Sequence, residues 1–482
     1  MSPGRDFVLE ALLRYNYFPN QKKHSDELPP LFTSASFSVQ TARALVVAKQ
    51  RNKKKGWDTA EYKITRFNGV SRCLAIPHPL AHAHLSLCIY EHWDKLKYIA
   101  NNPASMVCPR RHKDGRVIVM DYDNFLAKAT ASAQRAFGKR FTVHTDISNC
   151  FPTIYSHALP WATVGFNYAK AHRGNAEWFN QLDETLRGTK RNETQGVAIG
   201  PATSNIVTEA ILARVDEALR KLKFTHIRYV DDYTAYCETE AEAQEFTRNL
   251  SFELSKYKLL LSVNKTKIGT LPQPISNEWI IELAASIPSS PRLNSYDALR
   301  FLDHAVDLAK KEPEGSVLKY AIRTLLRKNL TVAAHRDLLH RALELSFHQP
   351  ALLPLLKELF QRTLALGKFY HSATVHALAE ENARFHRSDG MCWSLYYLNL
   401  YAVPIQQRLA DNILASKDCL SLLLLYKSGQ ITHRDKVVDF AKKLDQSDHY
   451  ELDQYWPLLY QLFLDGLITN PYVDEDTKKW RG

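Results

Sequence analysis

Cysteine is scarce in this sequence, with seven in 482 residues, and the number is odd. The cysteines are widely scattered and none belongs to a Cys-x-x-Cys pair: Cys73, Cys88, Cys108, Cys150, Cys237, Cys392 and Cys419. A disulfide framework needs paired cysteines, and a structural zinc site needs closely spaced ones. The sequence therefore argues against both, and we expect a reduced, cytoplasmic protein.

Long apolar runs are also missing from the chain. The amino terminus shows no apolar h-region of a signal peptide, and the longest leucine run, Leu420 to Leu425, is interrupted by Ser421 and is far shorter than a bilayer requires. We therefore expect no membrane association. Hydrophobic residues make up 45% of the chain and aromatic residues 11%, as in folded globular proteins. The length favours two or three domains.

The charge of the chain is positive and unevenly distributed. The formal net charge is +12, which favours a polyanionic partner such as nucleic acid. Residues 1–290 contain 38 Lys and Arg against 28 Asp and Glu, whereas residues 291–482 contain 25 against 23. The amino-terminal part is therefore the predicted nucleic-acid-binding part. Its densest basic segment, residues 49–57, fits either a phosphate or oligomer contact or a solvated loop.

An Asp-Asp pair occupies the bend of a β-hairpin predicted between residues 226 and 237. The flanking residues are β-branched and aromatic, as in strands. A loop that needs only a turn more often contains Asn-Gly or Asp-Gly. Adjacent Asp231 and Asp232 repel each other unless a cation neutralises them. The pair is therefore interpreted either as a metal-binding turn or as a solvated turn.

Asp146 stands at the end of another predicted strand, because the alternation of polar and apolar residues stops there. Carboxylates on neighbouring strand ends are the ligands that a pair of Mg²⁺ ions needs for nucleotidyl transfer. We predict that Asp146 and Asp231 bridge two Mg²⁺ ions, with Mn²⁺ as an alternative. The Ile147 carbonyl is a further predicted ligand, and Asp232 is secondary.

A basic hairpin is predicted from residue 62 to residue 77. Two alternating runs flank an Asn-Gly pair, which is a good hairpin signal. The strands of this hairpin carry Lys63, Arg66 and Arg72.

Four segments resemble, in order, motifs A to D of reverse transcriptases. They are Asp146 with Phe151, the loop Gln195 to Asn205, Tyr229 to Asp232, and Asn264 to Thr266. The resemblance spans residues from about 60 to 270. It implies an α+β fold with the fingers and palm of a right-hand polymerase, and nucleotidyl transfer from dNTPs in the manner of an RNA-directed DNA polymerase.

The resemblance also assigns roles to residues that meet the incoming nucleotide. Phe151 corresponds to the steric gate, an aromatic ring under the sugar that leaves no room for a 2′-hydroxyl. Gln195 and Gly196 correspond to the loop that contacts the nucleotide, where glycine lets the backbone come close. Tyr229 is a further predicted substrate contact.

Charged residues receive roles from the same resemblance. Arg72 is the best match to the cations that hold the triphosphate, and Lys63 and Arg66 are the other candidates. Lys265 resembles the motif D lysine that is proposed to protonate the leaving pyrophosphate. A structural surface lysine is the alternative for Lys265.

Strand signals stop near Pro291, and helical apolar repeats take over. Helix pairs separated by short polar breaks predict an all-α, HEAT-like repeat domain, with an irregular helical bundle as the alternative. The predicted domains are an N-terminal helical extension (1–60), the fingers and palm (61–285) and the helical domain (286–482).

The outer segments resemble the abortive-infection group of bacterial reverse transcriptases, through residues 27–32 and 315–321. This resemblance implies defence against phage, DNA synthesis without a copied template, a single-stranded product attached to a tyrosine, and a homo-oligomer. The sequence does not select one of the 23 tyrosines; Tyr15 and Tyr17 are candidates, with core packing as their alternative role. The alternatives are an RNA-templated reverse transcriptase with a partner RNA and a catalytically silent RNA-binding module.

Overall fold

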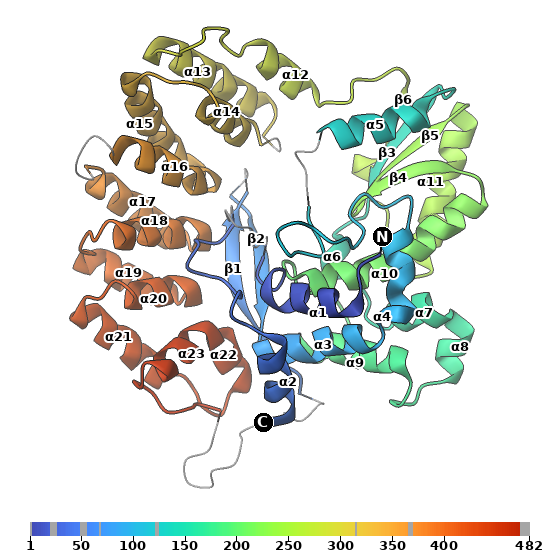
Figure 1. Ribbon diagram of the computed structural model, residues 1–482, viewed down its shortest axis with the longest axis horizontal. Helices are drawn as coiled ribbons and strands as arrows, with labels where there is room; N and C mark the ends of the chain where they lie inside the picture. The colour runs from blue at the N-terminus through green and yellow to red at the C-terminus, as the bar shows by residue number, and fades with distance from the viewer. Residues whose placement is uncertain are drawn as a thin grey trace.

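The computed structural model describes residues 2–19, 27–48, 55–66, 69–120, 125–313, 316–364 and 370–472. A two-stranded ribbon stands between a four-stranded sheet and a long stack of helices (Figure 1). Within these ranges, no helix is both long and apolar enough to cross a lipid bilayer. The seven cysteines, all in described segments, are free thiols, and six of them are buried.

The four-stranded sheet is antiparallel and has the order β4-β5-β3-β6. Its strands are β3 (Phe141–Asp146), β4 (Thr225–Tyr229), β5 (Asp232–Cys237) and β6 (Lys267–Thr270). The predicted hairpin around the Asp-Asp pair and the predicted end of a strand at Asp146 are both confirmed. A short 3-10 helix (Val263–Lys265) precedes β6.

Helices surround this sheet, and most of them contribute buried side chains to one hydrophobic core with it. They are α3 (Pro79–Glu91), α4 (Trp93–Leu96), α5 (Phe125–Ala136), α6 (Cys150–Thr153), α7 (Ala158–Val164), α8 (Phe166–Ala171), α9 (Trp178–Gly188), α10 (Ala202–Lys221) and α11 (Glu240–Ser255). A 3-10 helix covers Lys97–Asn101. The long helix α10 begins directly after Pro201 and is buried along most of its length. The loop that precedes α10 therefore leads into the core of the domain.

The ribbon consists of β1 (Thr59–Thr65) and β2 (Ser71–Pro77), which pair antiparallel as predicted. Asn68 of the predicted turn lies outside the described residues, and Gly69 has a φ of 73°. The basic segment 49–54 also lies outside them, whereas Trp57 is buried and stacks on His78. Trp57 therefore has a packing role.

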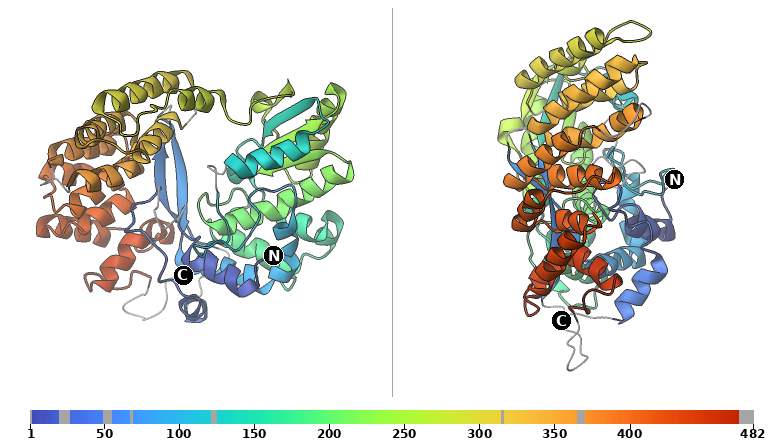
Figure 2. Two further views of the ribbon diagram at one scale, coloured as in Figure 1. Left: turned by 45° about the horizontal axis from the view of Figure 1, so that its top comes forward. Right: turned by 90° about the vertical axis from the view of Figure 1, so that its left-hand side faces the viewer.

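The ribbon packs on the C-terminal helices (Figure 2). Ala60, Tyr62, Leu74 and Ile76 belong to one core with those helices, and the indole N–H of Trp456 donates to the Ile76 carbonyl over 3.2 Å. The Asp389 carboxylate also joins the ribbon to the stack, because it accepts hydrogen bonds from Thr65. The ribbon and the helical stack therefore form one packed unit.

The C-terminal part of the described chain is helical from residue 278 onward, as predicted. Its helices are α12 (Glu278–Ala285), α13 (Ser295–Lys311), α14 (Val317–Leu326), α15 (Val332–His348), α16 (Leu353–Leu364), α17 (Ser372–Arg384), α18 (Ser388–Leu400), α19 (Gln407–Ser416), α20 (Cys419–Tyr426), α21 (Ile431–Lys442), α22 (His449–Gln454) and α23 (Trp456–Leu464). A 3-10 helix (Pro350–Leu352) precedes α16. From α13 to α20, each helix contacts the next but one, which gives two parallel layers.

The N-terminal segment does not pack as a separate unit. Helix α1 (Arg5–Arg14) contributes to the core of the sheet, α2 (Val39–Ala48) lies on α3, and Tyr17, Leu28 and Phe32 join the core of the helical stack. Helix α12 falls inside the predicted palm range but packs on α13 and α14. The domain boundaries at residues 60 and 285 stay predictions.

Candidate active site

Asp146 and the tip of the β4–β5 hairpin meet at one edge of the sheet. Asp146 is the last residue of β3 and lies opposite Asp232, the first residue of β5. The backbone N–H of Ile147 donates to the Asp231 carbonyl over 3.2 Å, and Ser262 donates to the Asp146 carbonyl over 2.7 Å. Hydrogen bonds from both sides therefore fix the end of β3 against the hairpin.

The side chains of Asp146 and Asp231 are close enough to influence each other. Burial raises the pKa of Asp231, and the negative charge of Asp146 raises it further, while Arg72 and Lys265 lower it. Two carboxylates that repel each other in a partly dry site favour either a proton or a cation. The arrangement is therefore one that a metal ion would stabilise.

The two oxygens of Asp146 have different surroundings. Oδ2 accepts from the Lys265 ammonium over 2.6 Å. Oδ1 is buried, and no described residue donates a hydrogen bond to it. A buried carboxylate oxygen without a donor is costly, and a divalent cation is a partner that carboxylates accept readily. The residues at this point fit a metal ion.

The three predicted aspartates differ in their exposure. Over the described ranges, no set of three or more His, Cys, Asp or Glu side chains is arranged to hold a metal ion. Asp232 is exposed, whereas Asp146 is buried. The metal roles of Asp146, Asp231 and Asp232 stay predictions.

Ile147 lies next to the hairpin tip, and its metal-binding role stays a prediction. It forms an antiparallel bridge with Leu261, and the two hydrogen bonds of that bridge come from its neighbours, Asp146 and Ser148. In this geometry the N–H and C=O of Ile147 itself point away from Leu261. Its N–H meets Asp231, so its carbonyl faces the hairpin as well.

The three predicted cations of the ribbon do not gather at one point. Arg72 is partly buried and its charge reaches Asp231. Lys63 pairs across the ribbon with Cys73, and Arg72 with Ile64, so the side chains of Lys63 and Arg72 leave opposite faces. Arg66 is exposed beyond the end of β1.

Lys63 lies on the other face of the ribbon, beside the helical stack. Its ammonium lies 3.4 Å from the Glu61 carboxylate. Both side chains line a cavity of about 320 Å³ whose other walls come from the stack, including His386, Asp418 and Tyr455. The structure therefore brings Arg72 to the acids and leaves Lys63 and Arg66 away from them.

Phe151 and the Gln195–Gly196 loop are joined by backbone hydrogen bonds. Phe151 lies in α6 and is 7% exposed. Its carbonyl accepts from Val197 over 3.0 Å, and Gly196 donates to Ile154 over 2.8 Å. The loop thus lies directly on the segment that carries the predicted gate, while the Gln195 side chain is exposed.

Gly196 occupies a position that favours glycine. Its φ is 84°, and a Cβ there would lie 3.1 Å from the Pro152 carbonyl oxygen and 2.9 Å from the Lys190 ammonium nitrogen. The Lys190 ammonium also donates to the Gln195 carbonyl over 3.1 Å. The absence of a side chain therefore allows the loop to approach the α6 segment closely.

Comparison with known families identifies the part of the chain that carries this site. Residues 104–306 match the family described as reverse transcriptase (RNA-dependent DNA polymerase). This segment is a reverse transcriptase domain. It contains Asp146, Phe151, Gln195 and the hairpin tip, whereas the ribbon with Arg72 lies outside the match. The match indicates a nucleotidyltransferase of the reverse transcriptase type, and this family implies nucleotide substrates and nucleic acid.

Comparison with solved structures gives distant similarities. Apo telomerase from Candida tropicalis, truncated from the C-terminal domain, is 14% identical with a TM-score of 0.33, over 51% of this chain and 57% of that chain. Apo telomerase from Candida tropicalis is 11% identical with a TM-score of 0.36, over 89% and 77%. Telomerase from Candida albicans with a TWJ fragment of telomeric RNA is 10% identical with a TM-score of 0.31, over 81% and 66%. No curated protein matches the sequence.

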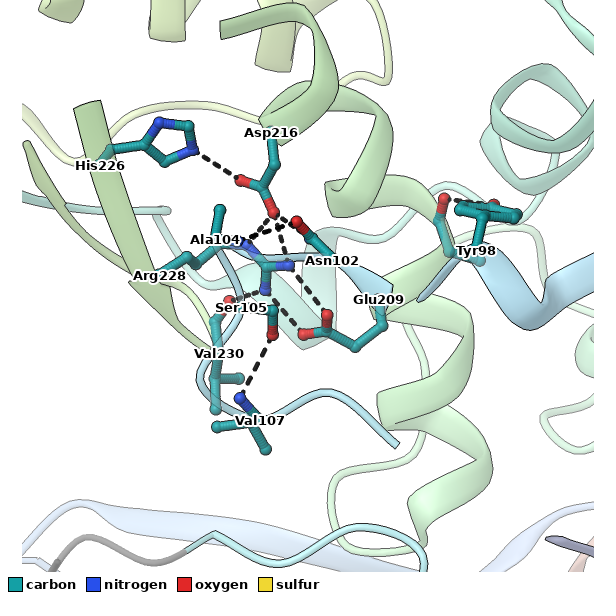
Figure 3. A network of polar contacts seen from close by, with 11 residues as sticks. Tyr98, Asn102, Ala104, Ser105, Val107, Glu209, Asp216, His226, Arg228 and Val230 are labelled. Atoms are coloured by element: carbon teal, nitrogen blue, oxygen red, sulfur yellow. Dashed lines mark hydrogen bonds and ion pairs between the residues drawn. The ribbon is translucent and has the colours of Figure 1, made fainter. Parts of the chain in front are cut away.

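A buried polar network lies behind the hairpin tip of the reverse transcriptase domain (Figure 3). Its centre is Arg228 in β4, a residue that the sequence analysis did not single out. The Arg228 guanidinium binds both oxygens of Glu209, at 2.7 and 2.9 Å, and Asp216 at 2.8 Å. Little in the sequence signalled this role, because Arg228 alternates with Ile227 and Tyr229 and so resembles a residue of the polar face of the strand.

Lys265 lies on Asp146, not apart from the acids. Its side chain is 61% exposed and its ammonium is 2.6 Å from Asp146 Oδ2. The residue sits at the end of the short 3-10 helix that precedes β6. The charge of Lys265 therefore acts on both Asp146 and Asp231.

Proposed function

We propose that this protein is a DNA polymerase that transfers nucleotides from dNTPs to a hydroxyl group. The hydroxyl oxygen forms a bond to the α-phosphorus, the bond from that phosphorus to the bridging oxygen breaks, and pyrophosphate leaves. Asp146 and Asp231, with the Ile147 carbonyl, would hold two Mg²⁺ ions, or Mn²⁺. When bound, such ions lower the pKa of the attacking hydroxyl and neutralise the triphosphate.

The observation that carries this proposal is the state of Asp146 beside Asp231. One oxygen of Asp146 is buried without a hydrogen-bond donor among the described residues, and Asp231 has a raised pKa. A carboxylate pair kept only for stability would be hydrogen-bonded more completely. A divalent cation satisfies both groups at once.

Other residues around the acids have roles that follow from their positions. Arg72 would bind the triphosphate, because its charge reaches the acid pair from the ribbon. Phe151 would pack under the sugar and exclude a 2′-hydroxyl, and the Gln195–Gly196 loop would contact the nucleotide. Lys265, whose ammonium lies on Asp146, would donate a proton to the leaving pyrophosphate.

Substitution of Asp231 by asparagine tests the proposal. Asp231→Asn keeps the size of the side chain and removes a charge that would bind metal, so DNA synthesis should fall more than about 100-fold. Glu238→Gln, at the other end of β5, is the matched control. Glu238 is exposed and pairs with Lys139, so this variant should keep wild-type synthesis. Synthesis retained in Asp231→Asn would contradict the assignment.

We further propose that the protein works in bacterial defence against phage, in the cytoplasm, and that its DNA synthesis needs no template. The resemblance of residues 27–32 and of the helical C-terminal part to the abortive-infection group supports this proposal. Residues 27–32 are tied into the fold, since the Glu27 carbonyl accepts from Tyr62 and Trp393 over 2.9 Å each. The primer would be a tyrosine hydroxyl, a weak nucleophile that needs activation.

The helical stack supports a HEAT-like interpretation within this proposal. Its helices contact their neighbours in two layers, as in α-solenoids. Such a stack offers an extended surface for a second copy of the chain, and we propose a homo-oligomer, which light scattering of the purified protein would test.

Three reactions distinguish the proposed activity from its alternatives. Purified protein with labelled dNTPs and Mg²⁺, without added nucleic acid, should yield DNA attached covalently to protein, and mass spectrometry should locate it on a tyrosine. Product that forms only with an RNA template and copies it would favour a templated reverse transcriptase. No product in either mixture, with RNA still bound in a gel-shift experiment, would favour a silent RNA-binding module.

A further inference from the structure

The backbone at the hairpin tip adopts an unfavourable conformation just before Asp231. The strand pairing ends at Tyr229 and Asp232, which leaves Val230 and Asp231 as a two-residue turn. Val230 has a φ of 59°, in the left-handed region. This region is disfavoured for β-branched residues, and the first position of such a turn usually contains glycine. Something outside the turn must therefore hold Val230.

Arg228 supplies that hold. Its NH1 group donates to the Val230 carbonyl over 2.7 Å, across the turn that it precedes (Figure 3). The backbone of Arg228 is fixed as well, because its N–H donates to Ala104 over 2.7 Å and its carbonyl accepts from Met106 over 2.8 Å. The guanidinium therefore contacts the turn from a fixed position.

The anchors of Arg228 come from a different part of the domain. Glu209 and Asp216 are seven residues apart on α10, the helix that follows the Gln195–Gly196 loop, and both are buried. Asn102 donates to Asp216 over 2.6 Å, and His226 lies 3.4 Å from it. The network connects α10 to the peptide that precedes Asp231.

Stability alone is a poor reason for this network. Arg228 has no exposed surface. Burial of a charged group costs several kcal/mol, and the attraction to its partners does little more than offset this cost. A well-packed apolar cluster would be about as stable. A planar guanidinium can bind two carboxylates and a carbonyl at fixed angles, which an apolar cluster cannot do.

We propose that Arg228 is a positioning residue, which keeps Val230 in the left-handed conformation and thereby directs the Asp231 carboxylate toward Asp146. The proposal rests on the nucleotidyl transfer proposed above. Arg228 would not contact the substrate, and it would act through the geometry of the turn.

The test uses Arg228→Lys together with changes in the turn. Lysine keeps the buried positive charge but cannot donate hydrogen bonds to Glu209, Asp216 and the Val230 carbonyl at the same time. We expect Arg228→Lys to lower kcat at least about tenfold with KM for dNTP within about twofold, and to weaken Mn²⁺ binding at least about fivefold in titrations followed by electron paramagnetic resonance.

A second substitution separates positioning from stability. Glycine adopts a positive φ without steric cost, so Arg228→Lys/Val230→Gly should recover most of the lost kcat and Mn²⁺ affinity. Arg228→Lys/Val230→Ala is the matched control: it removes the two methyl groups of valine but keeps the Cβ, and it should recover much less. Tyr98→Phe, which removes a 2.8 Å hydrogen bond to Ala210 on the same helix, should leave both readouts unchanged.

Each outcome decides the inference. Equal recovery with Gly and Ala, or no effect of Arg228→Lys on Mn²⁺ affinity in protein that circular dichroism shows to be folded, would overturn it. If the wild type makes no DNA but Mn²⁺ affinity follows the expected pattern, the positioning role stands and only the proposed function fails.

Discussion

A buried carboxylate at the junction of the ribbon and the helical stack should make the stability of this protein depend on pH. Asp389, in the first turn of α18, accepts hydrogen bonds from the Thr65 backbone N–H and hydroxyl, over 2.8 and 3.0 Å. Burial raises the pKa of Asp389 from 3.8 to about 6, even though hydrogen bonds from Thr65 and Gly390 lower it. The folded protein therefore binds this proton more tightly than the unfolded chain.

The sign and size of the effect follow from this difference in pKa. Because the folded state binds the proton of Asp389 more tightly, protonation of this carboxyl stabilises the fold. The stabilisation is complete below the unfolded pKa, near 4, and it is lost as the pH rises through about 6. About two pKa units correspond to about 3 kcal/mol. Between pH 7.5 and pH 4, the free energy of unfolding should therefore rise by about 3 kcal/mol relative to a variant in which this group cannot titrate.

Asp389→Asn provides that variant. Urea unfolding followed by circular dichroism at several pH values, with the variant subtracted from the wild type, isolates the contribution of this carboxyl from those of all other acids. Asp435→Asn is the control, because Asp435 is an exposed residue of α21. A difference between wild type and Asp389→Asn that stays constant within about 0.5 kcal/mol across this range would refute the reasoning.

Two further predictions concern substrate binding. Arg72→Gln should raise KM for dNTP about tenfold or more, because a charge-assisted hydrogen bond is lost, whereas Lys63→Gln, on the other face of the ribbon, should stay within about twofold in the same dNTP titrations. An equal effect of both would contradict the placement of Arg72 alone at the site. Phe151→Ala should raise the relative kcat/KM for rNTPs over dNTPs at least about tenfold, and unchanged rejection of rNTPs in folded protein would exclude the gate role.

Local patterns in the sequence predicted the strands that carry the acids. Alternation and turn residues decide where a strand ends, and they placed Asp146 at the end of β3 and the Asp-Asp pair at a hairpin tip. The ribbon was predicted on the same grounds. Such features depend on neighbours within a few residues, which a sequence displays directly.

Contacts between distant segments were not predicted. The pairing of Lys265 with Asp146 spans 119 residues, and the contacts of Arg228 with Glu209 and Asp216 depend on how α10 lies behind the sheet. The face of the ribbon that Lys63 occupies depends on the C-terminal helices. None of these arrangements leaves a periodic signal in the segments concerned.

The C-terminal helices contribute to the site although their charge is nearly balanced and they lie apart from the acids. They share one core with the ribbon, and Asp389 and Trp456 bind its backbone. Moving the ribbon relative to the stack would expose Tyr62, Leu74 and Ile76, at a cost of about 1.5–3 kcal/mol for each large side chain. The position of Arg72 is therefore set by the helical stack, and a movement that brings Arg72 closer to Asp231 must carry the stack with it.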